Sequence, residues 1–245
     1  VRNWQVEIHV RDRNADVTDV QAFGMHVVVN AAMSVDGKLA ARTREQLAIS
    51  GPEDFDRVDR IRAAADGVMV GVGTVLADNP HLTLDVTDRR VQRQRHGRSG
   101  NPARVVADST ARTPTDARIL DDEATTYILV SEDAPEKRRA ALADAGAELI
   151  VAGDERVDLT AAVDRLTDEG IDRLMIEGGG ELIYSAFAAE IVDELSVYIG
   201  SKIIGGRDAP TLADGEGFVE DFPALTLDDI ERFDDGVVLH YTVTD

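Results

Sequence analysis

Two glycine loops contain the residues whose types and spacing point most directly to chemistry. One lies in residues 67–80 (GVMVGVGTVLADNP) and the other in residues 173–187 (RLMIEGGGELIYSAF). In both, an apolar run typical of a β-strand ends in glycines that open an expected helix. Backbone N–H groups at such a helix start favour phosphate, because they are uncapped and lie at the positive end of the helix dipole. The pair predicts a cofactor with more than one phosphate, held between the two loops.

The second loop carries the stronger signal. Its consecutive glycines, Gly178, Gly179 and Gly180, would expose neighbouring amides and let a pyrophosphate touch the main chain. A flexible connector is the alternative. Glu177 ends the apolar run just before them. Because α/β sheets bind ligands at the carboxyl ends of their strands, we expect Glu177 either to bind substrate hydroxyls or to pair with a neighbouring amide.

The first loop is weaker evidence when taken alone. Its sequence Gly71-Val72-Gly73-Thr74 lacks the third glycine of the dinucleotide fingerprint, where Leu76 stands instead. A tight strand-to-helix turn would explain it without any ligand. We expect Thr74 to cap the following helix, and Asp78 to accept a hydrogen bond from a ribose or an amide.

Two basic residues are further candidates. Lys38 follows the turn Asp36-Gly37 and is one of only three lysines, with Lys137 and Lys202, in a strongly acidic chain. Because lysine is so rare in this chain, we favour a functional role for Lys38 over an exposed or salt-bridged position. Arg62 falls in a helix expected from Pro52 onwards, where it faces either a phosphate in the cleft or solvent.

The remaining charged clusters predict less. The five histidines are not spaced as metal ligands, so the sequence gives no reason to expect a metal. Residues 86–103 are polar and rich in arginine with Gly and Pro, which indicates a surface loop. The arginines within residues 89–98 either attract phosphate locally or are simply solvated.

The elements that position these residues alternate in type from Met25 onwards. Mostly alternating strands and helices, with a strand-rich end after Asp193, predict a three-layer α/β fold with a mixed, mostly parallel sheet. Expected strands cover residues 25–32, 67–72, 103–107, 126–130, 148–151, 173–177, 194–199, 225–233 and 236–243. Expected helices cover residues 52–65, 74–77, 134–145, 159–169 and 181–189. We expect residues 25–245 to form one domain, and residues 1–24 to be an extension that is disordered or forms a short strand.

Composition limits the partners and the location. The chain has 245 residues, with 26 basic and 47 acidic side chains and a net charge of −21. This charge disfavours nucleic acid and anionic membranes as partners, and it predicts either adaptation to high salt or an ordinary acidic cytoplasmic protein. The absence of cysteine excludes disulfides, thiolate nucleophiles and iron–sulfur clusters. No apolar run approaches the roughly 20 residues that span a bilayer, so we expect a soluble cytoplasmic protein.

Five motifs occur in an order typical of a known family. They are NAAMSVDGKLA, VGVGTVLADNPHLT, RVVADSTARTP, IEGGGELI and DELSVYIGSKIIGG. Together they resemble the reductases of riboflavin biosynthesis, particularly the stand-alone archaeal members. The resemblance implies a dihydrofolate-reductase-like fold, NADPH (or NADH) as hydride donor, and usually a homodimer. It also implies a phosphorylated pyrimidine substrate whose ribosylamino group is reduced to ribitylamino.

The resemblance also assigns site residues. The positions that it implies for NADPH binding are Thr74, Asp78, Ser109, Gly178, Gly179, Gly180 and Glu181. Lys38 and Glu177 match contacts to the ribosyl chain of the substrate. Arg62 matches a substrate-phosphate position, and Leu82 lies on the pyrimidine side.

One departure and two alternatives remain open. The bacterial members end the first loop with Arg, whereas Asp85 stands there in this chain. A carboxylate does not bind phosphate, so that contact must move to Arg62, to the arginines of residues 89–98 or to a partner subunit. A dihydrofolate reductase would need an acidic residue reaching the pterin, and residues 52–65 contain several. A nucleotide-sensing protein without catalysis is the alternative from another class.

Overall fold

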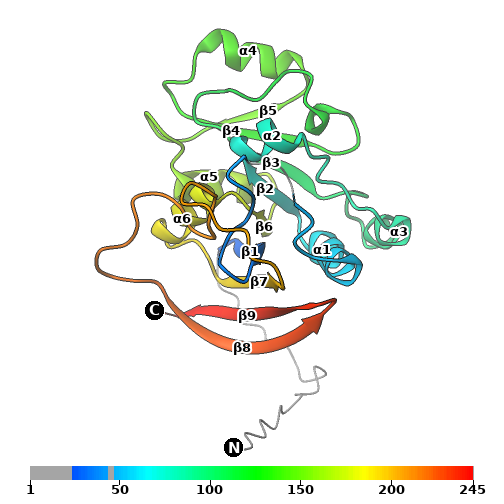
Figure 1. Cartoon of the computed structure of the whole chain (residues 1–245). Helices are drawn as coiled ribbons and strands as arrows, with labels where there is room; N and C mark the ends of the chain where they lie inside the picture. Colours follow the sequence, from blue (N-terminus) through cyan, green and yellow to red (C-terminus); the bar gives the residue numbers. More distant parts are fainter. Residues whose placement is uncertain (1–23, 44–46, 245) are drawn as a thin grey trace, which may run out of the picture.

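A computed structural model describes residues 24–43 and 47–244, and in these residues the chain forms one nine-stranded sheet (Figure 1). The strand order is β5-β4-β3-β2-β6-β1-β7-β9-β8. The strands from β5 to β7 run parallel, and β9 and β8 are joined to them by antiparallel pairing. The mixed, mostly parallel sheet is therefore confirmed. Of the expected N-terminal extension, residues 1–23 lie outside the described residues.

The strands lie close to their predicted positions. Their bounds are β1 (His26–Ser34), β2 (Gly67–Gly71), β3 (Ala103–Ala107), β4 (Thr126–Val130), β5 (Glu148–Val151), β6 (Arg173–Glu177), β7 (Glu194–Gly200), β8 (Ala224–Phe233) and β9 (Gly236–Thr244). The parallel strands β2, β3, β4 and β6 are largely buried. Strands covered on both faces read as continuous apolar runs, which is why the sequence located them well.

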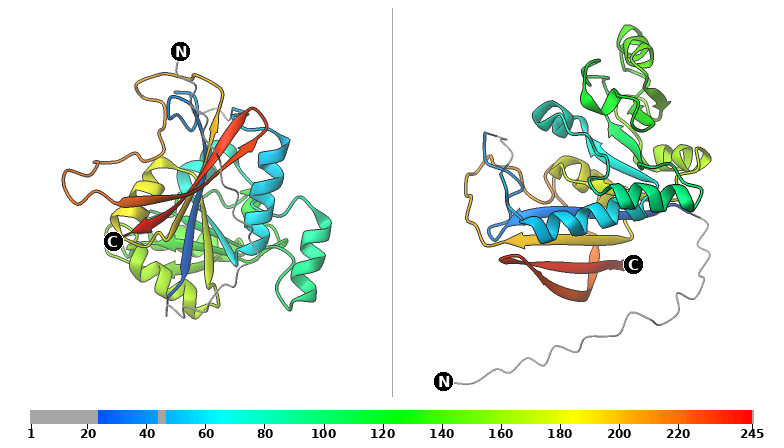
Figure 2. Two further views of the ribbon diagram at one scale, coloured as in Figure 1. Left: turned by 90° about the horizontal axis from the view of Figure 1, so that it is seen from below. Right: turned by 90° about the vertical axis from the view of Figure 1, so that its right-hand side faces the viewer.

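The helices cover both faces of the sheet. Their bounds are α1 (Pro52–Ala64), α2 (Val72–Asp78), α3 (Thr87–Arg95), α4 (Glu136–Asp144), α5 (Leu159–Asp168) and α6 (Gly180–Ala188), with a 3₁₀ turn η1 (Arg118–Leu120). One apolar cluster joins α5 and α6 to one face. A second cluster joins α1, α2 and α4 to the other face. Figure 2 shows α1 and α6 on opposite sides, which confirms the three layers.

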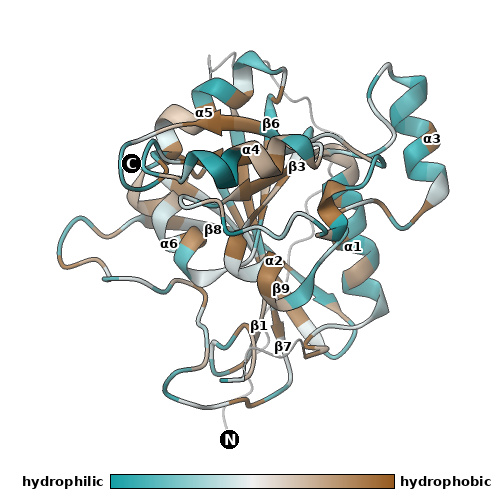
Figure 3. Cartoon of the chain, turned by 90° about the horizontal axis from the view of Figure 1, so that it is seen from above, coloured by the Kyte–Doolittle hydropathy of each residue, from teal (hydrophilic) through white to brown (hydrophobic). Residues whose placement is uncertain are grey.

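Residues 86–103 are not the predicted surface loop, because α3 occupies their first half. This helix is almost entirely polar (Figure 3), and it is held by its arginines rather than by an apolar stripe. Arg93 is buried and donates to the carbonyl oxygens of Ala63 and Ala65 at 2.8 and 2.6 Å. Arg89 pairs with Asp59 at 2.6 Å. A pattern of apolar residues could not predict a helix that packs through guanidinium groups.

The hairpin β8–β9 closes one end of the sheet and reaches back to α1. Asp234, in the turn of the hairpin, accepts from the backbone N–H groups of Gly51, Glu53 and Asp54 at 3.1–3.2 Å. These amides have no partner within the helix, so a distant carboxylate supplies the cap. No helix in the part of the chain that the structure describes is long and apolar enough to cross a membrane.

Candidate active site

A cavity of about 610 Å³ lies at the carboxyl ends of β1, β2 and β6. Residues from both glycine loops line it, together with residues from α1 and from the segments that follow β1 and β7. The carboxyl ends of parallel strands are where α/β folds bind ligands. The sequence therefore located the main elements of the site.

The second glycine loop forms one wall of the cavity. Gly178 and Gly179 have φ of 72° and 85°, a left-handed backbone that favours glycine. Gly180 opens α6 beneath a crossing segment, and a Cβ there would lie 2.4 Å from the carbonyl oxygen of Thr211. Helix α6 starts without a side-chain cap, so its first N–H groups are available to a ligand.

The first loop meets the second. A Cβ added at Gly179 would lie 3.6 Å from the hydroxyl oxygen of Thr74. The prediction that Thr74 caps the helix is wrong, because α2 begins earlier, after Gly71, and has no side-chain cap. Thr74 instead lines the cavity from the first turn of α2, and Asp78 lines it from the last turn. Burial raises the pKa of Asp78 above its ordinary value.

Arg62 and Glu177 face each other across the cavity floor. Arg62 donates from Nε and Nη2 to the two carboxylate oxygens of Glu177, at 2.5 and 2.6 Å, and from Nη1 to the carbonyl of Thr83 at 3.2 Å. Burial alone would lower the pKa of Arg62, but the Glu177 carboxylate outweighs burial and raises that pKa. The family resemblance implies that these side chains contact different parts of a substrate. The structure joins them in a bidentate ion pair, which fixes both in place.

Leu82 lines the cavity with an unusual backbone. Its side chain is buried and its φ is 54°, which is uncommon for a residue other than glycine and often marks a functional segment. The preceding residue is held by Arg104, which is fully buried and donates to the carbonyl of His81 at 2.8 Å. Burial of an arginine beneath this segment keeps Leu82 at the edge of the site.

Two predicted residues lie away from the cavity lining. Lys38 donates through Nζ to the carbonyl of Ala209 at 3.3 Å. The two residues that follow it, Leu39 and Ala40, line the cavity. Ser109 accepts through its hydroxyl from the backbone N–H of Val157 at 3.0 Å. Both contacts join segments that are distant in the sequence, so the motifs alone could not show them.

The arginines within residues 89–98 are largely committed to the fold. Besides Arg89 and Arg93, Arg90 donates to the carbonyl of Leu84 at 2.8 Å, and Arg98 pairs with Asp66 at 2.6 Å. The backbone N–H of Asp85 donates to Asp59, which also holds Arg89. These guanidinium groups stabilise the packing of α3, and the geometry gives no support to a phosphate site among them.

Three residues of the site had no individual role predicted from the sequence. Asn30 lines the cavity from β1, and Asp214 lines it from the segment after β7. Arg57, five residues before Arg62 in α1, donates a hydrogen bond to the side-chain oxygen of Asn30. A polar residue inside the apolar run HVVVNAA was the available signal for Asn30. Nothing local marks Asp214 or Arg57.

The fold and the site define a class of protein, namely an α/β protein with a nucleotide-sized cavity between two glycine loops. The family model described as the RibD C-terminal domain matches residues 25–239. The chain belongs to this family. The expected resemblance to the reductases of riboflavin biosynthesis is therefore confirmed.

Individual relatives agree. The 2,5-diamino-6-ribosylamino-4(3H)-pyrimidinone 5′-phosphate reductase of Archaeoglobus fulgidus is 47% identical over 86% of this chain and 94% of its own length. The protein of the same name from Methanothermobacter thermautotrophicus is 47% identical over 89% of this chain and 98% of its own length. A pyrimidine reductase-like protein from Corynebacterium diphtheriae, 22% identical, superposes with a TM-score of 0.80 over 90% of this chain and 92% of its own. These neighbours confirm the dihydrofolate-reductase-like fold.

Proposed function

We propose that this protein reduces the ribosylamino group of 2,5-diamino-6-(ribosylamino)-4(3H)-pyrimidinone 5′-phosphate to a ribitylamino group in riboflavin biosynthesis. The archaeal relatives that carry this activity in their names match the chain over most of its length. The observation that carries the proposal is the cavity, which is lined by both glycine loops and by the Arg62–Glu177 pair. Those relatives favour this activity over the dihydrofolate reductase alternative.

NADPH fits the glycine-lined part of the cavity, and NADH is the alternative. The N–H groups at the start of α6 would hold the pyrophosphate, since Gly178 and Gly179 leave no Cβ in its path. Thr74, Asp78 and Glu181 line the same part of the cavity and would contact the rest of the cofactor. The nicotinamide supplies a hydride.

The protein's own residues position the substrate. In its ring-opened form the ribosylamino group presents an imine carbon, C1′, that accepts the hydride. Glu177 is held by Arg62 and would accept hydrogen bonds from the sugar hydroxyls, while Leu82 would pack along the pyrimidine. Lys38 would contact the sugar chain or supply a proton during ring opening. Such positioning of the imine carbon against the nicotinamide would lower the barrier to hydride transfer.

The test is NADPH oxidation, followed by absorbance, in molar KCl with the enzymatically prepared substrate. We expect rapid oxidation and a ribityl product identified by mass spectrometry. Dihydrofolate serves as the control substrate and should give no turnover. If the protein binds NADPH in a separate assay but does not oxidise it with this substrate, the proposed substrate is refuted. The assignment of the fold would still hold.

We also propose a homodimer that forms through the outer face of the β8–β9 hairpin. Leu225, Leu227 and Ile230 of β8 are 40–49% exposed, and clustered exposed apolar side chains typically mark an interaction surface. Light scattering in high salt should give twice the chain mass for the wild type. Leu227→Glu should give the monomer mass, and a dimeric Leu227→Glu variant would place the interface elsewhere.

A further inference from the structure

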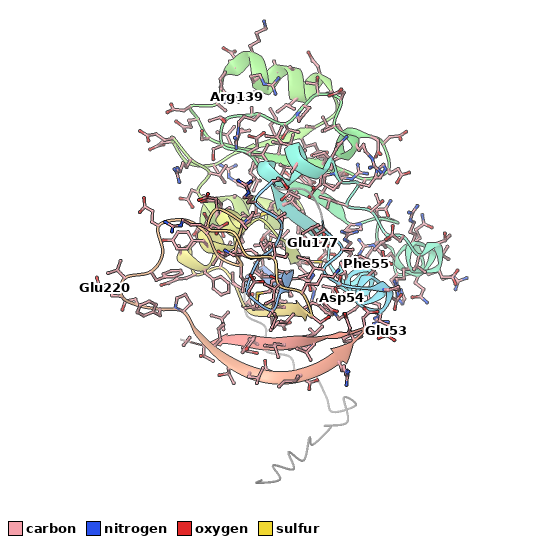
Figure 4. The ribbon with its side chains drawn as sticks, in the orientation of Figure 1. Glu53, Asp54, Phe55, Arg139, Glu177 and Glu220 are labelled. Carbon is pink, nitrogen blue, oxygen red and sulfur yellow. The ribbon has the colours of Figure 1, made fainter. Side chains whose placement is uncertain are left out.

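Helix α1 directs two arginines at polar side chains of three adjacent strands. Arg62 holds Glu177 of β6, and Arg57 holds Asn30 of β1 and Ser196 of β7. Asn30 is in register with Glu177 on one side and with Ser196 on the other. The helix therefore holds a row of polar side chains across three adjacent strands, and two of them, Asn30 and Glu177, line the cavity (Figure 4 shows Glu177 beside α1).

The contacts of Arg57 determine how Asn30 is oriented. Its Nε donates to Asp54 at 2.8 Å, its Nη1 to the hydroxyl of Ser196 at 2.8 Å and its Nη2 to the side-chain oxygen of Asn30 at 2.9 Å. All four residues are buried. A guanidinium only donates hydrogen bonds, so the oxygen end of the Asn30 amide must face Arg57 and the NH₂ end must face away.

The NH₂ end of Asn30 has no protein acceptor among the described residues, although Asn30 is only 6% exposed. The amide nitrogen of Asn30 is not fully enclosed by protein atoms. Asn30 lines the cavity, so a ligand can reach this nitrogen. A largely buried donor without an acceptor costs free energy, unless a ligand or water completes its hydrogen bonds. Its position therefore points to a ligand atom that accepts.

We infer that Asn30 is a substrate-binding residue that donates from Nδ2 to an oxygen of the ribosyl chain, and that Arg57 is the residue that positions it. The inference rests on the proposed function. Adjacent strands lie about 4.8 Å apart, so the Asn30 donor and the Glu177 acceptor can engage neighbouring oxygens of one sugar chain. A fixed donor beside a fixed acceptor selects a polyhydroxylated substrate, because an analogue lacking those hydroxyls would leave both groups unpaired.

The direct test replaces the donor and keeps the contact with Arg57. In Asn30→Asp one carboxylate oxygen still accepts from Arg57, and the other presents an acceptor to the substrate. We expect kcat/KM for the ribosylaminopyrimidine phosphate to fall at least about tenfold, with NADPH affinity within twofold and no loss of thermal stability. Unchanged kcat/KM would overturn the inference.

A matched control makes the same chemical change at a buried asparagine outside the cavity. Asn101 accepts from the backbone N–H of Leu84 and donates to the carbonyl of Glu123. Asn101→Asp should therefore lower the melting temperature and leave kcat/KM within twofold. An equal kinetic loss in both variants would assign the effect to general destabilisation and overturn the role of Asn30.

The positioning role of Arg57 is tested by a double-mutant cycle. If Arg57 acts through Asn30, Arg57→Met should lower kcat/KM in the wild type and have little further effect in an Asn30→Ala background. Additive losses would overturn this role. Should Arg57→Met fail to fold, Arg57→Lys takes its place in the same cycle. A wild type that is inactive on this substrate would refute the proposed function as well, whereas an active wild type with an unaffected Asn30→Asp refutes only this inference.

Discussion

At the scale of single residues, the basic charge of the cavity lining is paired. The cavity lining in the described part of the chain contains one basic side chain, Arg62, whose charge is balanced by Glu177. A buried ion pair holds its members rigidly, and removal of one partner leaves an uncompensated charge. The pair therefore stabilises the fold, and under the proposed function it also positions the substrate, so a mutation should affect both properties.

Glu177→Gln tests this double role. The amide offers one oxygen where the carboxylate offers two, so Arg62 loses one charge-assisted hydrogen bond and its counter-charge. We expect a loss of about 1–3 kcal/mol in the free energy of unfolding and a higher KM for the pyrimidine substrate. Urea unfolding and steady-state kinetics measure the two effects. Glu155→Gln, at an exposed site, should change neither, and unaltered stability in Glu177→Gln would contradict the role of the pair.

Lys38 gives a second prediction at this scale. Its ammonium has three donors, and one of them is used by the carbonyl of Ala209. We expect Lys38→Ala to lower kcat by at least about tenfold while NADPH affinity stays nearly unchanged. Lys137→Ala, on the exposed side of α4, is the matched control. Parallel losses of turnover and NADPH binding would show that Lys38 only supports the cavity wall.

At the scale of elements, α1 connects the site to the hairpin. It carries Arg62, which lines the cavity, and Arg57, which holds Asn30, and Asp234 of the β8–β9 turn caps its first amides. Asp234 has φ of 51°, a left-handed conformation that Asn adopts at a lower cost than Ala. Asp234→Ala should cost about 1 kcal/mol or more, and Asp234→Asn should retain most of the stability. Thermal melts compare them, and equal melting temperatures for wild type and Asp234→Ala would contradict the cap.

The loop after β1 is joined to the segment after β7 by one carboxylate. Asp36 accepts from the hydroxyl of Ser34 at 2.6 Å and from the backbone N–H groups of Ile204 and Gly205 at 3.0 and 2.7 Å. The Ser34 hydroxyl, followed by these amides, lowers the pKa of Asp36 from 3.8 to about 2. The ionised form is thus the one that joins the two segments beside the cavity.

This depressed pKa predicts a pH dependence with a definite sign. A group whose pKa is lowered by folding stabilises the protein fully above its ordinary pKa, and this contribution is lost as the pH falls through the folded value. The melting temperature of the wild type should therefore exceed that of Asp36→Asn above about pH 4, and the difference should shrink towards about pH 2. A difference that stays constant over this range would contradict the assignment.

At the scale of the whole molecule, charge sets the conditions for binding. The chain carries a net charge of −21, and four carboxylates, Asp78, Glu177, Glu181 and Asp214, line the cavity beside the single arginine. Both proposed ligands are anions, so the protein repels them at low ionic strength. Salt screens this repulsion over a few ångströms at molar concentration.

The KM for NADPH should therefore fall as KCl rises from low to molar concentration, on the order of threefold to tenfold. Steady-state kinetics at several KCl concentrations measure it, and the melting temperature at each concentration controls for stabilisation of the fold. A KM that rises with salt, as expected for a site dominated by free cations, would contradict this electrostatic account and the proposed adaptation to high salt.

The sequence by itself determined the order and bounds of most elements, the two glycine loops and the family. Apolar strands buried on both faces and glycines at helix starts are local patterns, because burial and backbone conformation act on neighbouring residues. These patterns did not predict helix α3, because α3 packs against α1 through its arginines and has no apolar stripe. Local patterns therefore predict where the chain turns and which glycine loops line the candidate cavity.

Only the tertiary structure decided which side chains meet. It paired Arg62 with Glu177 across 115 positions, placed Arg57 behind Asn30 and left Lys38 and Ser109 outside the cavity lining. A guanidinium reaches its partner because a helix packs on a sheet. The number of residues between the two partners in the sequence does not predict that they will be close in space. The sequence gives the identity of each polar side chain. The orientation of that side chain and the ion pairs it forms depend on the neighbours that the fold places around it.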